Sequence, residues 1–356
     1  MHFDHGTMNR DYSRYTWWKA VFTALSLFLL AAAALYGISR GAANVPLAEV
    51  FKALVGQSDS RRFEIIVWNI RLPQVLSAVV AGAGLSTSGA VMQSILRNPL
   101  GSPFTLGISH AAAFGAAFAV MILGSGAMAS SNVGAVTISN PYVTTGSAFA
   151  FCMLAAFFIV GISRMRGATP ETMVLSGVAL GALFTAGTMF LQFFADDVQL
   201  AAMVFWTFGD VGRASWGELG IITLVTVPSL LYFAANAWNY NAVDAGDETA
   251  RGLGVRVERI RMQGMVIASL VTAVTVSFLG IIGFVGLVCP HVVRRIIGAD
   301  NRFLLPATAV VGALLLLLSD TAARLVMAPH LLPVSILTAF MGAPVFMVLI
   351  VRGYRA

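Results

Sequence analysis

The chain has 356 residues, of which 58% are hydrophobic and only 11% are charged, and its mean hydropathy is +0.83. Soluble domains carry about a quarter charged residues, so this composition excludes an ordinary water-soluble domain and indicates an integral membrane protein. The net charge of +6 does not indicate nucleic-acid binding, because no basic cluster is interleaved with aromatic residues.

Ten apolar segments are each predicted to cross the membrane as a helix, since about 20 apolar residues span a hydrocarbon core of about 30 Å. Helices are favoured over barrel strands, because the runs are continuous and rich in Ala, Leu, Val and Gly. The predicted spans are 17–38, 72–95, 104–123, 143–163, 172–194, 217–236, 261–280, 283–297, 305–328 and 333–351.

The remaining segments complete a single transmembrane domain over 17–352. Residues 1–16 are polar and are predicted to form a cytoplasmic tail, followed by a first span that is retained. Short amphipathic surface helices are predicted at 44–56 and 196–210. Glycines and a proline interrupt the region 279–298, and such a broken helix is tolerated only where it is buried or lines a cavity.

Basic residues predict the orientation of the chain. With the N-terminus in the cytoplasm, the inner segments hold fifteen Lys and Arg residues and the outer segments seven. Because cytoplasmic loops of membrane proteins are enriched in these residues, both termini are predicted to be cytoplasmic.

The chain lacks several kinds of chemistry. Its two lysines, Lys19 and Lys52, do not belong to a phosphate-binding loop, and no metalloprotease motif or nucleophile elbow occurs. Cys152 and Cys289 lie in apolar runs and are interpreted as core residues, so no metal site is predicted. These absences favour a pore or carrier, not an enzyme, driven by another chain. A secondary transporter using Asp320, a membrane enzyme and a non-transporting subunit remain alternatives.

The segment 246–261, GDETARGLGVRVERIR, concentrates charged residues in an otherwise apolar chain. Asp247 and Glu248 are predicted to begin a helical turn, which Gly252 and Gly254 end before a second short turn at 255–259. Two short helices would form a rigid cytoplasmic projection able to transmit a partner's movement. A solvated loop that carries positive-inside charges explains the same residues equally well.

Several stretches together resemble the FecCD-type permeases, the membrane subunits of ABC importers for iron-siderophores, haem and cobalamin. The resemblance covers about 17–352 and includes the charged segment at 246–261. The other matching stretches are NIRLPQVLSAVVAGAGLSTSGAVMQSILRNPLGSPFTLGIS (69–109), VLSGVALG (174–181), GFVGLVCPHVVRRIIGADNRFLLP (283–306) and LLPVSILTAFMGAPVFMVLIVR (331–352).

The resemblance implies an all-α, BtuC-like (type II) importer fold of ten transmembrane helices in a bacterial or archaeal inner membrane. It also implies a homodimer around a central pore, two cytoplasmic ATPase subunits, and a periplasmic or lipid-anchored binding protein. ATP and Mg would be bound by the ATPases, so this chain is expected to need no cofactor. An iron complex of the siderophore type is the favoured cargo, with haem or cobalamin as alternatives.

The resemblance also assigns roles to residues. Cytoplasmic coupling helices at about 244–258 would bind the ATPases, with contacts at Asp247, Glu248, Arg251, Leu253 and Gly254. The cytoplasmic end of the pore would contain Asn98, Pro99 and Leu100. Asn98 could instead cap a helix. His110 could line the pore, or could be a packed, hydrogen-bonded histidine, and His291 and Pro290 are interpreted as structural.

Arginines on the outer face would dock the binding protein. Arg71 and Arg324 match the family's positions, whereas Gln74 stands where the family often has a third arginine. Docking could therefore be weaker, or could use Arg61 or Arg62 instead. The alternative for Arg324 is an internal ion pair with Asp320, four residues earlier on one helix face.

Overall fold

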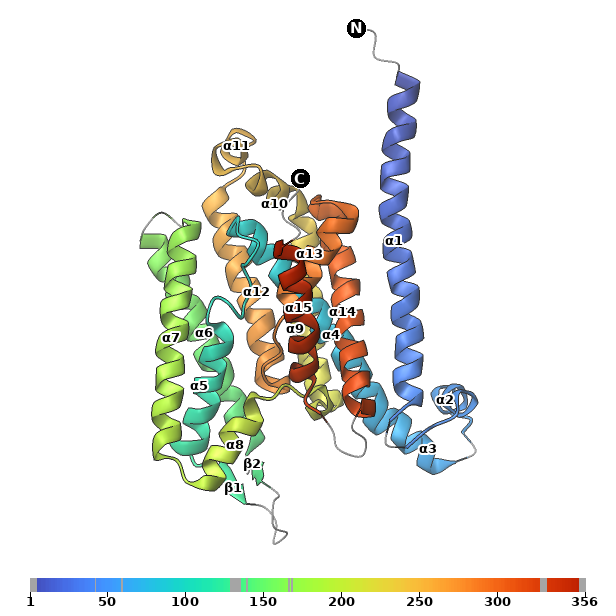
Figure 1. Cartoon of the computed structure of the whole chain (residues 1–356), viewed down its shortest axis with the longest axis vertical. Helices are drawn as coiled ribbons and strands as arrows, with labels where there is room; N and C mark the ends of the chain where they lie inside the picture. The colour runs from blue at the N-terminus through green and yellow to red at the C-terminus, as the bar shows by residue number, and fades with distance from the viewer. Residues whose placement is uncertain are drawn as a thin grey trace.

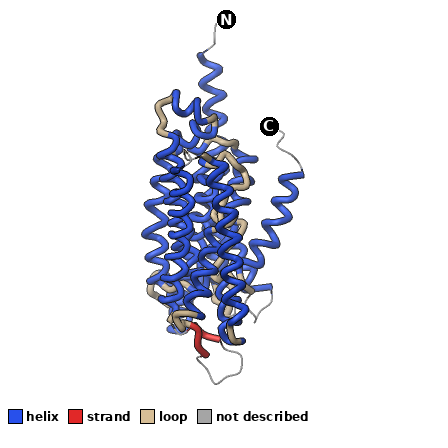
Figure 2. The backbone as a smooth tube through the Cα atoms, turned by 90° about the vertical axis from the view of Figure 1, so that its left-hand side faces the viewer, coloured by secondary structure: helices blue, strands red, loops and turns tan. Residues whose placement is uncertain are grey.

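The computed structural model describes residues 5–41, 43–58, 60–128, 136–138, 140–165, 167, 169–326 and 332–351. These residues form a bundle of long, roughly parallel helices (Figures 1 and 2). The long helices are α1 (His5–Ser39), α4 (Leu72–Ile95), α6 (Pro141–Met165), α7 (Pro170–Phe194), α9 (Trp216–Ala235), α12 (Val257–Leu279) and α14 (Asn301–Val326).

Shorter elements connect or complete the long helices. Three correspond to predicted spans: α5 (Ile108–Met121), α13 (Val285–Ile297) and α15 (Val334–Val351). The others are α2 (Leu47–Leu54), α3 (Arg61–Ile65), the π-helical turn η1 (Ile66–Arg71), α8 (Asp197–Thr207), the 3-10 turn η2 (Val211–Arg213), α10 (Ala237–Asp244), α11 (Asp247–Gly252), and the antiparallel strands β1 (Gly126–Met128) and β2 (Val136–Ile138).

Each of the ten predicted spans corresponds to a helix. Seven helices in the described part of the chain are long and apolar enough to cross a membrane, and one of these continues from α3 through η1 into α4, over Arg61–Ile95. The two predicted surface helices are confirmed as α2 and α8. Helix α1 begins at His5, so most of the predicted tail is helical, while residues 1–4 lie outside the described residues.

The two ends of the bundle carry different elements (Figure 1). The start of α1, the end of α15, α10 and α11 lie at one end, which we call the α11 end. Helices α2, α3 and α8 and the strand pair lie at the other, which we call the α8 end. The molecule therefore presents two distinct surfaces to the two sides of a membrane.

Helix α4 is the centre of the bundle and packs against α9, α12, α13 and α14. Two glycines allow this close packing: Gly82 lies against the backbone of Gly312 in α14, and Gly89 lies against the backbone of Gly286 in α13. A side chain at Gly89 would overlap the Gly286 carbonyl group. Small residues serve here as in other membrane helix pairs, where they let the backbones approach closely.

Two of the helices are interrupted within the bundle. Helix α13 begins only at Val285, after an irregular segment at 280–284, which confirms the predicted break. Helix α5 begins at Ile108, four residues later than predicted, because Gly107 adopts a left-handed conformation (φ 77°). A small cavity lies between the two breaks and is lined by residues of both, including Pro103, Phe104, Ile282 and Phe284.

Phe284 opens α13 with a backbone φ of 66°, a region that bulky residues rarely occupy. Its side chain packs directly against Gly342 in α15. The geometry of the break is therefore tied to the position of α15.

Candidate coupling and translocation sites

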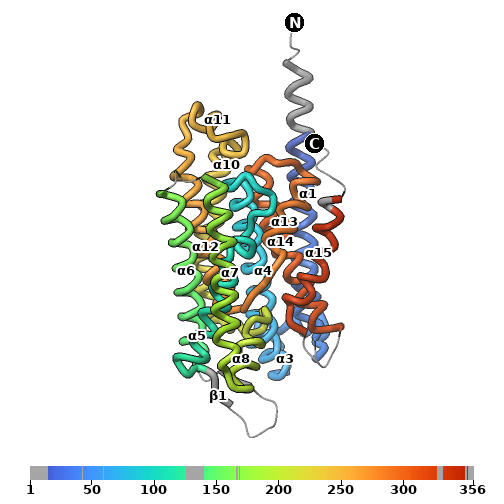
Figure 3. Tube along the Cα trace, turned by 60° about the vertical axis from the view of Figure 1, so that its left-hand side comes forward, coloured from blue at the N-terminus to red at the C-terminus, as the bar shows by residue number. Residues whose placement is uncertain are grey.

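Helices α10 and α11 form a projection at the α11 end, which we call the knob (237–254; Figures 1 and 3). Gly246 (φ 117°) separates the two helices, and Gly254 (φ 82°) follows the end of α11. The predicted helical turn that begins at Asp247 is confirmed as α11. The predicted second short turn at 255–259 is wrong, because Val257 is buried and begins the long apolar helix α12. The other short helix of the knob is α10, which lies before α11 and was not predicted.

The tip of the knob is exposed. Four of the five predicted ATPase contacts, Glu248, Arg251, Leu253 and Gly254, lie on its surface. The Leu253 side chain is 69% exposed beside charged neighbours. An apolar side chain surrounded by charges is the usual composition of a protein-binding surface, with an apolar centre and a polar rim.

Asp247, the fifth predicted contact, points into the molecule. Its carboxylate accepts hydrogen bonds of 2.9 and 3.2 Å from Nη2 of Arg261 and of 3.3 Å from Nη1. Arg261 is only 1% exposed and donates from Nε to the carbonyl oxygen of Ile95, at 2.7 Å. A direct role of Asp247 in ATPase binding stays a prediction, whereas its internal ion pair is present in the structure.

A second polar network holds α10 at the same end. The Asp244 carboxylate accepts hydrogen bonds from Ser94 in α4 (3.0 Å) and from Asn301 in α14 (2.9 Å). Asn241 donates to Asp300 at 2.9 Å. Burial raises the pKa of the Asp300 carboxyl, but hydrogen bonds from Arg302 and Asn241 outweigh this effect and lower it to about 2. Asp300 is therefore ionised at physiological pH.

The predicted pore-end residues lie in the loop that follows α4. The Asn98 side chain accepts a hydrogen bond from the backbone N–H of Leu100 at 2.9 Å, so it stabilises its own turn rather than capping a helix. Leu100 is 48% exposed. Nε2 of His291 lies 2.7 Å from the carbonyl oxygen of Pro99. This contact, which agrees with a structural role for His291, joins the loop to α13.

His110 lies in the first turn of α5 and is partly buried. Its ring centroid is 5.2 Å from that of Phe104. Among the described residues its buried Nδ1 has no hydrogen-bond partner. The side chain is therefore packed, but the structure does not supply the hydrogen bond that the structural interpretation expected at this nitrogen.

The two arginines predicted to dock the binding protein are buried towards the α8 end, each 6% exposed. Arg324 forms the ion pair with Asp320 that was the alternative prediction, with 3.1 Å between Nη2 and Oδ2. It also donates to the carbonyl oxygens of Gly37 and Arg40, at 3.1 and 3.2 Å. The structure thus gives Arg324 internal partners, and docking through it stays a prediction.

The neighbouring polar residues support this arrangement. Gln74 donates from Nε2 to Oδ1 of Asp320 at 3.0 Å, so the residue that replaces the family's third arginine joins the same buried cluster. The guanidinium group of Arg71 packs against Gly41. Arg61 and Arg62, the alternative docking residues, are exposed on α3 at the α8 end.

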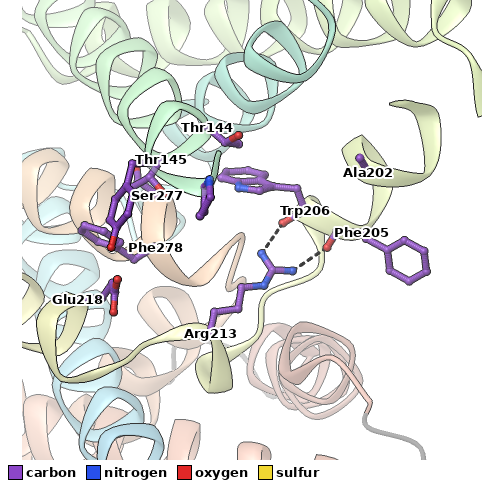
Figure 4. Close-up of a pocket in the computed structure, with 11 residues that line it drawn as sticks. Thr144, Thr145, Ala202, Phe205, Trp206, Arg213, Glu218, Ser277 and Phe278 are labelled. Atoms are coloured by element: carbon purple, nitrogen blue, oxygen red, sulfur yellow. Dashed lines mark hydrogen bonds between the residues drawn. The ribbon is translucent and has the colours of Figure 1, made fainter. Parts of the chain in front are cut away.

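A pocket of about 490 Å³ opens between α6, α8, η2, α9 and α12 (Figure 4). Its charged residues have structural partners. Arg213 donates to the carbonyl oxygens of Phe205 (2.8 Å), Trp206 (3.2 Å) and Phe208 (2.9 Å) at the end of α8. Glu218 accepts from the backbone N–H of Ser215 and completes a capping box at the start of α9. The motif analysis missed this role of Arg213, for which its position just beyond a predicted helix end was the available signal.

The sequence profile of the FecCD transport family matches residues 29–352. The chain belongs to this family. The Methanocaldococcus jannaschii protein MJ0087, whose name places it among ABC transporter permeases, is 51% identical over 97% of this chain and 98% of its own length. The hemin transport system permease protein HmuU of Yersinia pestis is 36% identical, covering 88% of this chain and 92% of HmuU.

Two further comparisons agree. The Fe(3+)-citrate import system permease protein YfmE of Bacillus subtilis is 34% identical, covering 88% of this chain and 89% of YfmE. A solved structure described as an inward-facing conformation of a transporter of the metal-chelate type superposes with a TM-score of 0.80 at 28% identity. It covers 93% of this chain and 99% of the solved chain. The FecCD permease therefore has the BtuC-type fold that the sequence resemblance implied.

Family membership defines the general function. The chain is the multi-pass membrane permease of an ABC importer for iron complexes, haem or cobalamin. An importer of this kind includes an ATPase and a binding protein as partners. The permease is the transport subunit and is not itself catalytic.

Proposed function

We propose that this FecCD permease imports an iron complex of the siderophore type across the inner membrane of a bacterium or archaeon. The observation that carries the proposal is the family match over 29–352. The names of similar proteins add support, since they include an Fe(3+)-citrate permease, a hemin permease and a transporter of the metal-chelate type. Haem and cobalamin are the competing cargoes.

In this proposal the α11 end faces the cytoplasm, and two permease copies form a homodimer that binds two ATPase subunits. The basic residues favour this orientation, with fifteen on the inner side and seven on the outer. The exposed knob tip, with Leu253 and Arg251, is the surface offered to each ATPase. ATP and Mg are bound by the ATPases, and this chain supplies no cofactor site. The homodimer itself is inferred from the family resemblance.

The binding protein, periplasmic or lipid-anchored, docks at the α8 end. Exposure favours Arg61 and Arg62 as its contacts, because Arg71 and Arg324 are buried and Arg324 has internal partners. Exposed arginines attract the carboxylates of an incoming partner and increase the rate of association. Arg71 and Arg324 would then support this surface from the interior of the bundle.

Transport follows from movement of the knob. ATP binding brings the two ATPases together and moves both knobs, the helices rock, and the loop at 98–100 opens or closes the inner end of the pore. To invert the populations of two pore states, from 1:99 to 99:1, ATP binding must favour one state by about 5.5 kcal/mol. This requires a stiff connection between the knob and the pore helices.

Reconstitution into liposomes tests the proposal. The permease, its ATPase and its binding protein would be supplied with ⁵⁵Fe-labelled ferric siderophores of several classes, hemin or cyanocobalamin, with and without internal ATP. We expect ATP-dependent accumulation of iron from at least one ferric siderophore. Accumulation of hemin or cyanocobalamin with no iron uptake from any siderophore would refute the proposed cargo. Cross-linking of two differently tagged permease copies tests the homodimer.

A further inference from the structure

Arg261 connects the knob to the central helix of the bundle. Its side chain is among the largest fully buried ones in the described chain. The guanidinium group reaches in two directions, with Nη1 and Nη2 on the Asp247 carboxylate of α11 and Nε on the carbonyl oxygen of Ile95. One rigid, planar group therefore contacts both α11 and the end of α4.

Ile95 is the last residue of α4, and the final carbonyl groups of a helix have no partner within the helix. A buried cation is well suited to this position, because the C-terminal end of a helix carries partial negative charge. The chain then turns sharply at Arg97 (φ 47°) into the loop that holds Asn98 and Leu100. Arg261 thus contacts the last residue of α4, directly before the loop that we propose as the inner end of the pore.

The rest of the knob is attached differently. Helix α10 contacts α4 through Asp244 and Ser94, at the residue before Ile95. The tip of α11 around Leu253 is exposed and available to a partner. Asp247 lies between these parts, since it is the first residue of α11 and its side chain is 28% exposed. Asp247 and Arg261 therefore form a contact between α11 and the end of α4 that is separate from the contact made by α10.

We propose that Arg261 is a positioning residue that transmits displacement of α11 to the end of α4 and its loop, so that ATP hydrolysis is coupled to pore movement. The inference rests on the proposed function, because it needs the ATPase to bind the tip of the knob. It concerns the internal link alone and adds no contact with ATPase or cargo. Lysine is a poor substitute at this position, because a single ammonium group cannot reproduce the fork geometry towards Asp247 together with the Nε bond to Ile95.

The test separates coupling from folding and from ATPase binding. Leu100→Cys places a reporter in the exposed loop, and the two native cysteines are buried. The assembled transporter is treated with a membrane-impermeant maleimide in nanodiscs, with and without ATP and vanadate. Three backgrounds are compared: Arg261 intact, Arg261→Lys, and the matched control Arg259→Lys, which makes the same change at an exposed position.

We expect ATP to change the labelling rate at least fivefold with Arg261 intact and with Arg259→Lys, but less than twofold with Arg261→Lys, while ATP hydrolysis stays within twofold of the unmodified rate. An unchanged ATP response in Arg261→Lys overturns the proposal. If Arg261→Lys does not fold or assemble, Asp247→Ala removes the carboxylate that Arg261 contacts from its partly exposed side. A full ATP response in that variant also overturns the proposal. Absence of any ATP response with Arg261 intact would instead contradict the proposed function, and this inference with it.

Discussion

The buried ion pair between Arg324 and Asp320 leads to a large predicted loss of stability when the arginine is replaced. The two side chains are 6% and 3% exposed, and their charged atoms are 3.1 Å apart. Arg324→Met keeps much of the side-chain volume but leaves the Asp320 carboxylate without its paired cation. Removing one partner of a buried pair costs about 3–5 kcal/mol, so the free energy of unfolding should fall by this amount.

Two further variants separate the contributions of the two side chains to this loss of stability. Asp320→Asn should cost less, about 1.5–3 kcal/mol, because Arg324 keeps its hydrogen bonds to the carbonyl oxygens of Gly37 and Arg40. Replacing both partners, Arg324→Met with Asp320→Leu, should recover much of the loss, because neither member of the pair stays buried without the other. Arg40→Met is the matched control, since this arginine is exposed, and it should change stability by less than about 0.5 kcal/mol.

The assay is unfolding of the purified permease in detergent, combined with the affinity of the folded fraction for its binding protein. If Arg324 acts through its internal partners, stability falls and the affinity of the folded fraction stays within about twofold. Unchanged stability together with a tenfold loss of affinity would refute the reasoning and restore Arg324 as a docking residue.

Three other changes have separate expected outcomes. Arg61→Glu with Arg62→Glu should weaken binding-protein affinity at least tenfold at low salt and leave stability unchanged, and an unaltered affinity would exclude α3 as the docking site. Gly89→Ala should lower the free energy of unfolding by about 1–3 kcal/mol, because the new methyl group overlaps a backbone carbonyl of α13. The control Gly161→Ala, which meets open space, should be neutral or stabilising. Leu253→Asp should reduce co-purification of the ATPase without changing permease stability, and full co-purification would contradict the role of the knob tip.

The long helices could be predicted because continuous apolar runs have few alternatives in a membrane. The break before α13 was also predictable, since Gly280 and Gly283 lie inside an apolar run and mark irregular backbone there. The start of α5 was not, because the residues on both sides of Gly107 are similarly apolar and only its left-handed backbone ends the loop. The helical start of α1 was missed because its first residues are polar.

The candidate sites were predictable as segments but not as side-chain directions. The charged run at 246–261 indicated a projection, yet adjacent acidic residues carry no signal for which one faces inward. In the structure Glu248 is exposed, and Asp247 contacts Arg261 from a different helix. Arg324 shows the opposite situation, because its spacing of four residues from Asp320 indicated the internal pair directly.

The backbone of Phe284 stores conformational strain at the break before α13. A bulky residue held at positive φ costs of order 1–3 kcal/mol, and it persists only while its surroundings enforce it. These surroundings include Gly342 in α15, which packs against the Phe284 side chain and leaves no room for a side chain of its own. Any motion that withdraws α15 removes that restraint and lets the residue relax. The strain at Phe284 therefore favours the conformation in which α15 has moved away from the break.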